Sequence, residues 1–258
     1  MNTADVTTLG LVASLLLVVV AIGFSATQRL GLEKDIVWAT LRSLIQLLIV
    51  GAVLAFVIDP EQPLILSWGW VLAMVAFAGV VIRRRAPEVP GVLPLGILAI
   101  GAAALVTLAV IFGLGVFPLE GRTLVPLAGM MVGNSMNATV LAARRVVDEF
   151  RDNRPEVEAR LALGQSARLA SRRYLRTALR TALTPQIETT KAVGLVFLPG
   201  AMTGLILAGV DPVEAVRVQA AIMYLILGSV ATTATVMTLG IGRRLFTDDH
   251  RLIRLPRS

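Results

Sequence analysis

The chain has 258 residues, of which 56% are hydrophobic, and a formal net charge of +7. Its mean hydropathy of +0.79 is far above that of a soluble domain of this length, so a soluble globular protein is excluded. The absence of cysteine excludes a disulfide framework, a thiolate metal site and an iron–sulfur cluster.

The apolar residues form blocks of about 20, which is the length that a helix needs to cross a bilayer. A membrane barrel would show alternating segments of about ten residues instead. The first block follows MNTADVTT, which lacks the basic flank of a cleaved signal peptide. We therefore predict an all-α polytopic membrane protein with about seven transmembrane helices in a single domain, residues 1–258. The predicted spans are 7–27, 36–58, 64–82, 93–114, 123–143, 191–210 and 217–241.

Basic residues cluster after alternate spans. Arg83–Arg85 follow the third predicted span and several arginines follow the seventh, whereas the intervening loop 59–63 (DPEQP) is acidic. Because basic loops stay in the cytoplasm, this pattern predicts an N-terminus outside and a C-terminus in the cytoplasm. The positive charge therefore reflects membrane topology, and no nucleic-acid partner is expected.

The longest predicted loop, 144–190, is rich in residues that favour helix. We predict a helix from about Pro155 to Ala182, because proline suits the first helical turn. The arginines of this segment recur at helical spacing, which fits a basic amphipathic helix on an anionic leaflet or a solvated linker. A third interpretation, a docking element for a partner, depends on one short motif.

That motif is EARLALG, Glu158–Gly164, which resembles the EAA signature of ABC-transporter permeases with Arg160 in place of the second alanine. In those permeases the signature forms a short cytoplasmic helix and turn that dock into a cleft of the ATPase subunit. Small residues let such a helix pack closely, and a glycine allows the turn. The resemblance implies a coupling role for Glu158, Ala159, Leu161, Gly164 and Gln165.

The fifth predicted span is the most polar one. Gly129, Gly133 and Asn137 recur every four residues, a spacing that lets another helix approach closely. Asn134 and Ser135 add polar groups that should face protein, because amides in lipid are costly. The two asparagines are expected either to bond neighbouring helices or, with Ser135, to line a translocation pathway.

The sixth predicted span reads GLVFLPGAMTGLILAG over residues 194–209, with Pro199 beside Gly200. Proline has no amide donor, so the helix should kink or unwind between about 195 and 200. Gly200 and Gly204 form a stripe of small residues suited to helix packing. Pro199 and the glycine stripe either serve helix packing with a tolerated kink, or the kink opens near the pathway and acts as a hinge for alternating access.

Metal ligands stay unassigned at the level of sequence. Met130, Met131 and Met202 are possible soft ligands on the pathway, although methionine is also ordinary filler in apolar helices. Glu188 and Lys191 are expected to mark the membrane surface, with Glu188 as a residue that could attract an incoming cation. No Asp or Glu lies in the central part of any predicted span, and this counts against an ion-coupled secondary carrier.

Three segments of the chain carry a resemblance to known proteins. They are GMMVGNSMNATVLAARR (129–145), EARLALGQS (158–166) and TPQIETTKAVGLVFLPGAMTGLILAGVDPVEAVRVQ (184–219). Together they resemble one family, the FetB-type permeases, and the resemblance covers essentially the whole chain. These permeases are membrane subunits of bacterial ABC transporters implicated in iron export and resistance to oxidative stress, with plant relatives linked to aluminium tolerance. One departure is Ala201, where a methionine is expected in much of the family, and this weakens a thioether metal site there.

The resemblance implies a homodimer of this subunit with two copies of a separate ABC ATP-binding subunit. The chain has no G-x-x-x-x-G-K-[ST] phosphate loop, so ATP is expected on that partner and no cofactor in this chain. No nucleophile, metal cluster or acid pair suggests an enzyme. The expected location is the bacterial inner membrane, where membrane lipids are a further expected partner of the chain.

The function that the resemblance implies is ATP-driven export of a metal ion, with iron as the substrate. An ABC permease for a nucleotide sugar and an ion-coupled secondary transporter are the alternatives. In the expected mechanism, closure of the ATPase subunits pushes the helix at 158–166, and spans five and six reorient about Pro199.

Overall fold

The computed structural model describes residues 8–194, 198–247, 249 and 251–253, and this part of the chain is all-α, as predicted. A single isolated bridge joins Phe246 and Leu252 after the last helix. The helices are α1 (Thr8–Thr27), α2 (Glu33–Val57), α3 (Leu64–Arg85), α4 (Val92–Gly113), α5 (Gly121–Asp152), α6 (Arg154–Ala162), α7 (Ala167–Ala192), α8 (Gly200–Leu207) and α9 (Pro212–Arg244).

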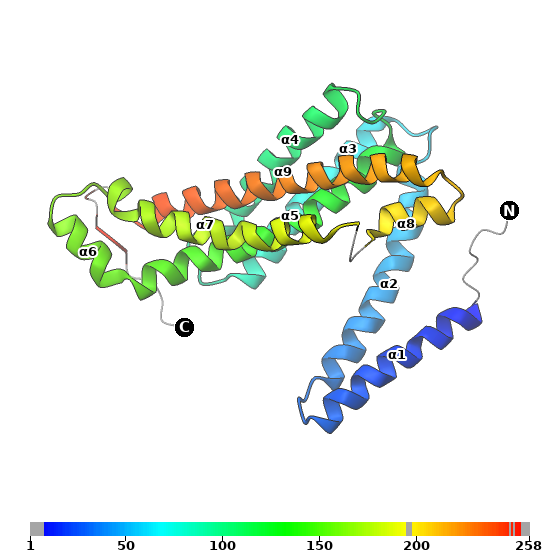
Figure 1. Cartoon of the computed structure of the whole chain (residues 1–258), viewed down its shortest axis with the longest axis horizontal. Helices are drawn as coiled ribbons and strands as arrows, with labels where there is room; N and C mark the ends of the chain where they lie inside the picture. The colour runs from blue at the N-terminus through cyan, green and yellow to red at the C-terminus, as the bar shows by residue number, and fades with distance from the viewer. Residues whose placement is uncertain (1–7, 195–197, 248, 250, 254–258) are drawn as a thin grey trace.

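The core is a bundle of α3, α4, α5 and α9, with α7 lying along α5 and α9 (Figure 1). Glycines allow the closest approaches between these helices. A Cβ on Gly96 would come within 3.2 Å of Ile82 Cδ1, and one on Gly240 would collide with the side chain of Leu95. α4 therefore packs tightly on both α3 and α9, and these contacts bury residues such as Ile100 completely.

One end of this bundle is held together by arginines. Arg144 donates to the carbonyl of Arg85 and lies 3.4 Å from the Glu88 carboxylate, while Arg244 Nη1 donates to Gly91 O at 2.6 Å. These bonds bring the ends of α3 and α9, the start of α4 and Arg144 of α5 to one level. We call it the arginine end of the bundle, and the positive-inside rule predicts that it faces the cytoplasm.

α1 and α2 form a hairpin that projects away from the bundle (Figure 1). Its turn is tied by Ser25, whose Oγ donates to Glu33 Oε1 at 2.7 Å and accepts from Leu32 N at 3.2 Å. Large apolar side chains are exposed along both helices, among them Leu17 and Leu48. The hairpin therefore leaves more apolar surface uncovered than the bundle does.

Five described helices are long and apolar enough to cross a membrane, namely α2, α3, α4, α5 and α9, and α1 is a further apolar helix. The chain is therefore a multi-pass membrane protein, as predicted. The span expected at 191–210 is wrong as a continuous helix, because α7 ends at Ala192 and α8 has only eight residues. The break predicted at Pro199 is confirmed by the extended backbone of that residue, directly before α8, while residues 195–197 lie outside the described part.

The segment 144–190 is helical, as predicted for this long loop between spans. α5 continues to Asp152, and α6 and α7 follow, so the single helix expected from Pro155 to Ala182 is interrupted by a turn at 163–166. Pro155 lies in the first turn of α6, as predicted. The cytoplasmic position of the segment stays a prediction.

α7 runs beside α9 in the opposite direction (Figure 1). A Cβ on Gly242 would come within 2.7 Å of Leu175 Cδ1, so these residues lie at one level, next to the arginine end. Glu188 follows about 20 Å further along α7 at 1.5 Å per residue. That places it level with Ser229, near the middle of the predicted span 217–241, whereas its expected position at the membrane surface stays a prediction.

Candidate functional site

α6 is seated firmly beyond the arginine end. Val157 is completely buried beneath it, and Arg154 Nε donates to Glu158 Oε1 at 2.7 Å. The same guanidinium donates to Ile253 O at 3.1 Å and to Leu252 O at 3.4 Å, so the C-terminal segment braces the start of α6. α6 is therefore held both by its apolar face and by the C-terminal segment.

A charged cluster joins α6 to α7. Glu156 Oε1 accepts from Arg160 Nη2 at 2.7 Å and lies 3.6 Å from Arg173 Nη1. The Arg160 guanidinium holds the pKa of the Glu156 carboxyl below its ordinary value. The Tyr174 hydroxyl lies close enough to lower that pKa further, although its geometry falls short of a hydrogen bond. Glu156 is therefore ionised near neutral pH and fixes the angle between the two helices.

Most of the predicted coupling residues lie on the exposed tip. Glu158, Ala159, Gly164 and Gln165 are exposed, whereas Leu161 is half-buried against the core. Gly164 has a φ of +83°, a left-handed conformation that favours glycine, and the turn predicted at this position is confirmed. The sequence analysis overlooked Leu163, which is 82% exposed at the same tip. An exposed leucine beside small and polar residues is suited to insertion into a protein cleft.

A polar face lies on the C-terminal half of α7. Thr184, Glu188 and Lys191 are exposed there, and Lys191 Nζ donates to Glu188 Oε1 at 2.9 Å. The threonines of this segment bond to the helix itself, as Thr184 Oγ1 does to Arg180 O at 2.8 Å and Thr190 Oγ1 to Gln186 O at 2.8 Å. Because charged side chains in lipid are costly, we expect this face to border water or another protein chain. We call Thr184, Glu188 and Lys191 the α7 polar face.

The polar residues of α5 lie in two different environments. Asn134 is exposed, and its Nδ2 donates to Met130 O at 2.8 Å within the helix. Asn137 is also exposed, and its Oδ1 accepts from Arg85 Nη1 at 2.9 Å. This bond links α5 to α3. For Asn137 it agrees with the first of the two alternatives, in which the asparagine bonds a neighbouring helix.

The other predicted pathway residues of α5 lie inside the bundle. Ser135 and Met131 are completely buried, and Met131 Sδ accepts from Thr107 Oγ1 of α4 at 3.2 Å. Met130 is half-buried against the core. The structure therefore places Asn134 and Asn137 on the surface of the bundle, and Met131 and Ser135 within it.

α8 is anchored by a residue that the sequence analysis did not single out. The amide of Met202 in the first turn of α8 donates to Gln219 Oε1 of α9 at 3.2 Å. Gln219 is only 4% exposed. The first amides of a helix have no partner within it, and in a membrane each of them needs one. The signal available in the sequence was a lone glutamine inside the seventh predicted span.

The glycines predicted for helix packing do not make close contacts within one chain. A Cβ on Gly133, Gly200 or Gly204 would find no atom within 4 Å, and one on Gly129 would meet only Met74 Cε at 3.8 Å. Their role in helix packing stays a prediction, because spacing identifies a smooth helix face without identifying what covers it. The close approaches are made by other glycines, such as Gly240.

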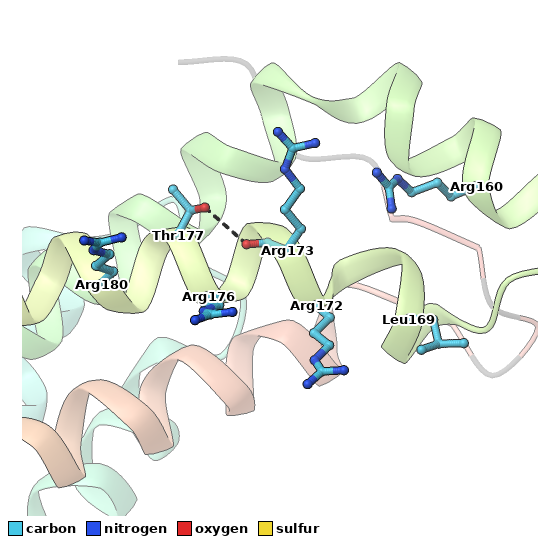
Figure 2. Close-up of a pocket in the computed structure, with 7 residues that line it drawn as sticks. All are labelled: Arg160, Leu169, Arg172, Arg173, Arg176, Thr177 and Arg180. Carbon is cyan, nitrogen blue, oxygen red and sulfur yellow. Dashed lines mark hydrogen bonds between the residues drawn. The ribbon is translucent and has the colours of Figure 1, made fainter.

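The described residues contain no group of three or more His, Cys, Asp or Glu side chains that could hold a metal ion. The surface of α7 next to the arginine end is strongly basic instead, as Figure 2 shows. A groove of about 460 Å³ there is lined by arginines and by Leu169 and Thr177. The arginines are Arg160, Arg172, Arg173, Arg176 and Arg180.

The family comparison places almost the entire chain in one group. The model of the uncharacterised protein family UPF0014 matches residues 8–246. The chain is 37% identical over 245 residues to the UPF0014 membrane protein STAR2 of Oryza sativa subsp. japonica, an alignment that covers 93% of this chain and 84% of STAR2. It is 34% identical over 244 residues to Protein ALUMINUM SENSITIVE 3 of Arabidopsis thaliana, covering 93% and 88% of the two chains.

A bacterial relative is similar over nearly its full length. The chain is 33% identical over 257 residues to the probable iron export permease protein FetB of Escherichia coli (strain K12), covering 98% of this chain and 97% of FetB. No solved structure matches the chain. The resemblance to FetB-type permeases that the sequence motifs indicated is confirmed by these relatives.

Proposed function

This chain belongs to the UPF0014 family, and from that membership we propose that it is the membrane subunit of an ABC transporter that exports a metal ion, with iron as the substrate. ATP is hydrolysed by a separate subunit, and two copies of this chain form the permease in the bacterial inner membrane. A role in iron homeostasis and in resistance to oxidative stress follows from iron export. The iron assignment rests on the similarity to FetB, which is named a probable iron export permease.

The observation that carries the transport proposal is the α7 polar face. Glu188 and Lys191 lie beside the middle of α9, an apolar helix long enough to cross a membrane, and both are exposed on the surface of the single chain. A permease needs a polar route at this depth, and a membrane protein without such a route gains nothing from exposed charges there. We assign the α7 polar face to the translocation pathway, with Glu188 as a transient ligand for the cation and Asn134 as a further polar group.

α6 is the element that the ATP-binding subunit moves. Leu163, Gly164 and Gln165 form the exposed tip that docks, while Arg154 and Glu156 join α6 to the C-terminal segment and to α7. Because α6 and α7 are linked by charged bonds, a displacement of the tip is passed along α7 to its polar face. α8 stays attached to α9 through Gln219, so it is displaced less than α7. The break at Pro199 accommodates this difference in displacement.

The test is transport into inside-out vesicles that contain this chain and its ATP-binding subunit. ATP-dependent uptake of iron(II) is expected, and Glu188→Gln is expected to lower it about tenfold, since a charged ligand is replaced by a neutral one. Glu214→Gln is the matched control, because Glu214 is exposed in the first turn of α9, at the end of the bundle opposite the arginine end. Parallel measurements with other divalent metals and with UDP-glucose identify the substrate. Equal iron(II) uptake by both variants contradicts the assignment of Glu188.

An ion-coupled secondary transporter is the second candidate, and one structural observation favours it. The sequence counted against such a carrier because no acidic residue was expected in the central part of a span. Glu188, however, lies level with Ser229, in the middle of the predicted span 217–241. Ion-coupled carriers use ionisable groups of this kind. Uptake by the chain alone, driven by a proton or sodium gradient and unaffected by ATP, would select this candidate over the ABC permease.

A further inference from the structure

A second groove lies between α7 and α9, beside the arginine end. It measures about 590 Å³ and has two kinds of lining. Arg168, Arg172 and Arg176 of α7 line it together with the leucines of both helices. Its apolar wall consists of Leu175, Leu179 and Leu239, of which Leu239 is 51% exposed, so the groove is open to the surroundings of the bundle.

The arginines of this groove have no negative partner. None of Arg168, Arg172 and Arg176 makes an ion pair within the described part of the chain, and no acidic side chain is among the described residues that line the groove. A neighbouring hollow on the same two helices adds a fourth arginine, Arg243. Figure 2 shows Arg172 and Arg176 on the side of α7 that faces α9, whereas Arg173 points toward α6. The groove therefore presents an uncompensated positive charge.

The depth of the groove matches the boundary between headgroups and acyl chains. Leu175 packs on Gly242, and Arg244, two residues further on, bonds to Gly91 at the arginine end. Thr238 and Leu239 lie about one turn closer to the membrane centre. The arginines thus sit at the level of lipid phosphates, and the leucines extend from them in the direction of the acyl chains.

We propose that the α7–α9 groove is a binding site for one anionic phospholipid of the cytoplasmic leaflet. The phosphate is held by Arg172 and Arg176, and an acyl chain lies on Leu175, Leu179 and Leu239. Basic pockets between transmembrane helices on the cytoplasmic side bind anionic headgroups in this way. A free anion would use the arginines and leave the leucines uncovered, so the joint arrangement of both kinds of residue favours a lipid. The site is independent of what the protein transports.

The test uses the full-length chain purified in detergent and native mass spectrometry with phosphatidylglycerol and phosphatidylcholine of identical acyl chains. Phosphatidylglycerol is expected to be retained preferentially, and Arg172→Gln/Arg176→Gln to reduce its retention about 30-fold, because each arginine near an anionic surface contributes to the attraction. Arg83→Gln/Arg84→Gln is the matched control. It removes the same charge from exposed arginines at the same end of the bundle, on α3 and outside the groove.

A further variant separates a lipid from a free anion. Leu239→Asn is expected to lower phosphatidylglycerol retention several-fold, since it removes part of the apolar wall at an exposed position that the fold does not depend on. Equal retention by the two arginine double variants overturns the proposal. It is also overturned if inorganic phosphate displaces phosphatidylglycerol completely, or if the groove variants change only the proportion of dimer, since a second copy would then cover the groove.

Discussion

Gly164 shows how one residue shapes the tip that docks. Its φ of +83° is unfavourable for any residue with a Cβ, yet a Cβ there would find no atom within 4 Å. A substitution at this position therefore strains the backbone without causing a collision. The change acts on the turn between α6 and α7 and leaves the bundle as it is.

We expect Gly164→Ala to weaken binding of the ATP-binding subunit several-fold, because a left-handed alanine costs roughly 1–2 kcal/mol. The measurement is co-purification of the two subunits, together with ATP hydrolysis by the complex. Gly101→Ala is the control, since Gly101 lies in α4 with helical backbone and open space around its Cβ position. Unchanged subunit binding by the Gly164 variant would show that the turn does not dock.

Leu163 and Glu158 illustrate why the exposed tip after α6, which we propose to dock, could be identified only in part from the sequence. The motif around Glu158 has the spacing of a known signature, so the sequence was sufficient to select it. Leu163 is an ordinary apolar residue in the sequence, and only the turn after α6 leaves it 82% exposed. Its importance depends on exposure, which is a property of the folded chain.

At the scale of elements, a buried side chain of α9 holds the first turn of α8. Its first turn begins after Pro199, so its amides lack partners within the helix, and Gln219 Oε1 accepts from that of Met202. The buried glutamine thereby links the short helix to the longest one. This link holds the start of α8, which does not continue directly from α7.

We expect Gln219→Leu to lower the free energy of unfolding by about 1–3 kcal/mol, because a buried amide is left without an acceptor. The thermal midpoint of the purified chain in detergent should fall by several degrees, and transport should fall with it. The matched control is Gln28→Leu, since Gln28 is exposed just after α1. A Gln219 variant with the wild-type midpoint would mean that water or lipid replaces the bond.

At the scale of the whole molecule, the α1–α2 hairpin is the part that a single chain leaves uncovered. It projects from the bundle (Figure 1), and α2 exposes Arg42 and Gln46 as well as apolar residues such as Trp38 and Leu48. Lipid satisfies the apolar side chains, but the arginine and the glutamine prefer a protein surface. These features support the proposed homodimer, with the hairpin of one copy lying on the other.

The absence of cysteine makes this arrangement simple to test. Leu48→Cys, at a position 67% exposed on α2, is expected to cross-link two copies in membranes when a short bifunctional thiol reagent is added. Leu105→Cys is the control, because Leu105 is 75% exposed on α4, across the bundle from the hairpin (Figure 1). Equal cross-linking at the two positions would contradict a dimer formed through the hairpin.

The sequence by itself determined that this is an all-α membrane protein, where most of its spans begin, and that Pro199 interrupts one of them. The physical reason is that lipid offers no hydrogen-bond partners, so apolar blocks of helical length and a proline within one have few possible structures. The family resemblance could be read from motifs for a similar reason, since long runs of residues rarely match by chance.

Only the tertiary structure decided where α7 lies. The segment from Thr184 to Lys191 is polar, and polar residues look the same in a sequence whether they face the cytoplasm or a route through the membrane. The packing of Leu175 on Gly242 places that segment beside the middle of α9, and the same packing creates the groove between α7 and α9. Depth is set by which helix lies beside which, and composition carries no information about that neighbour.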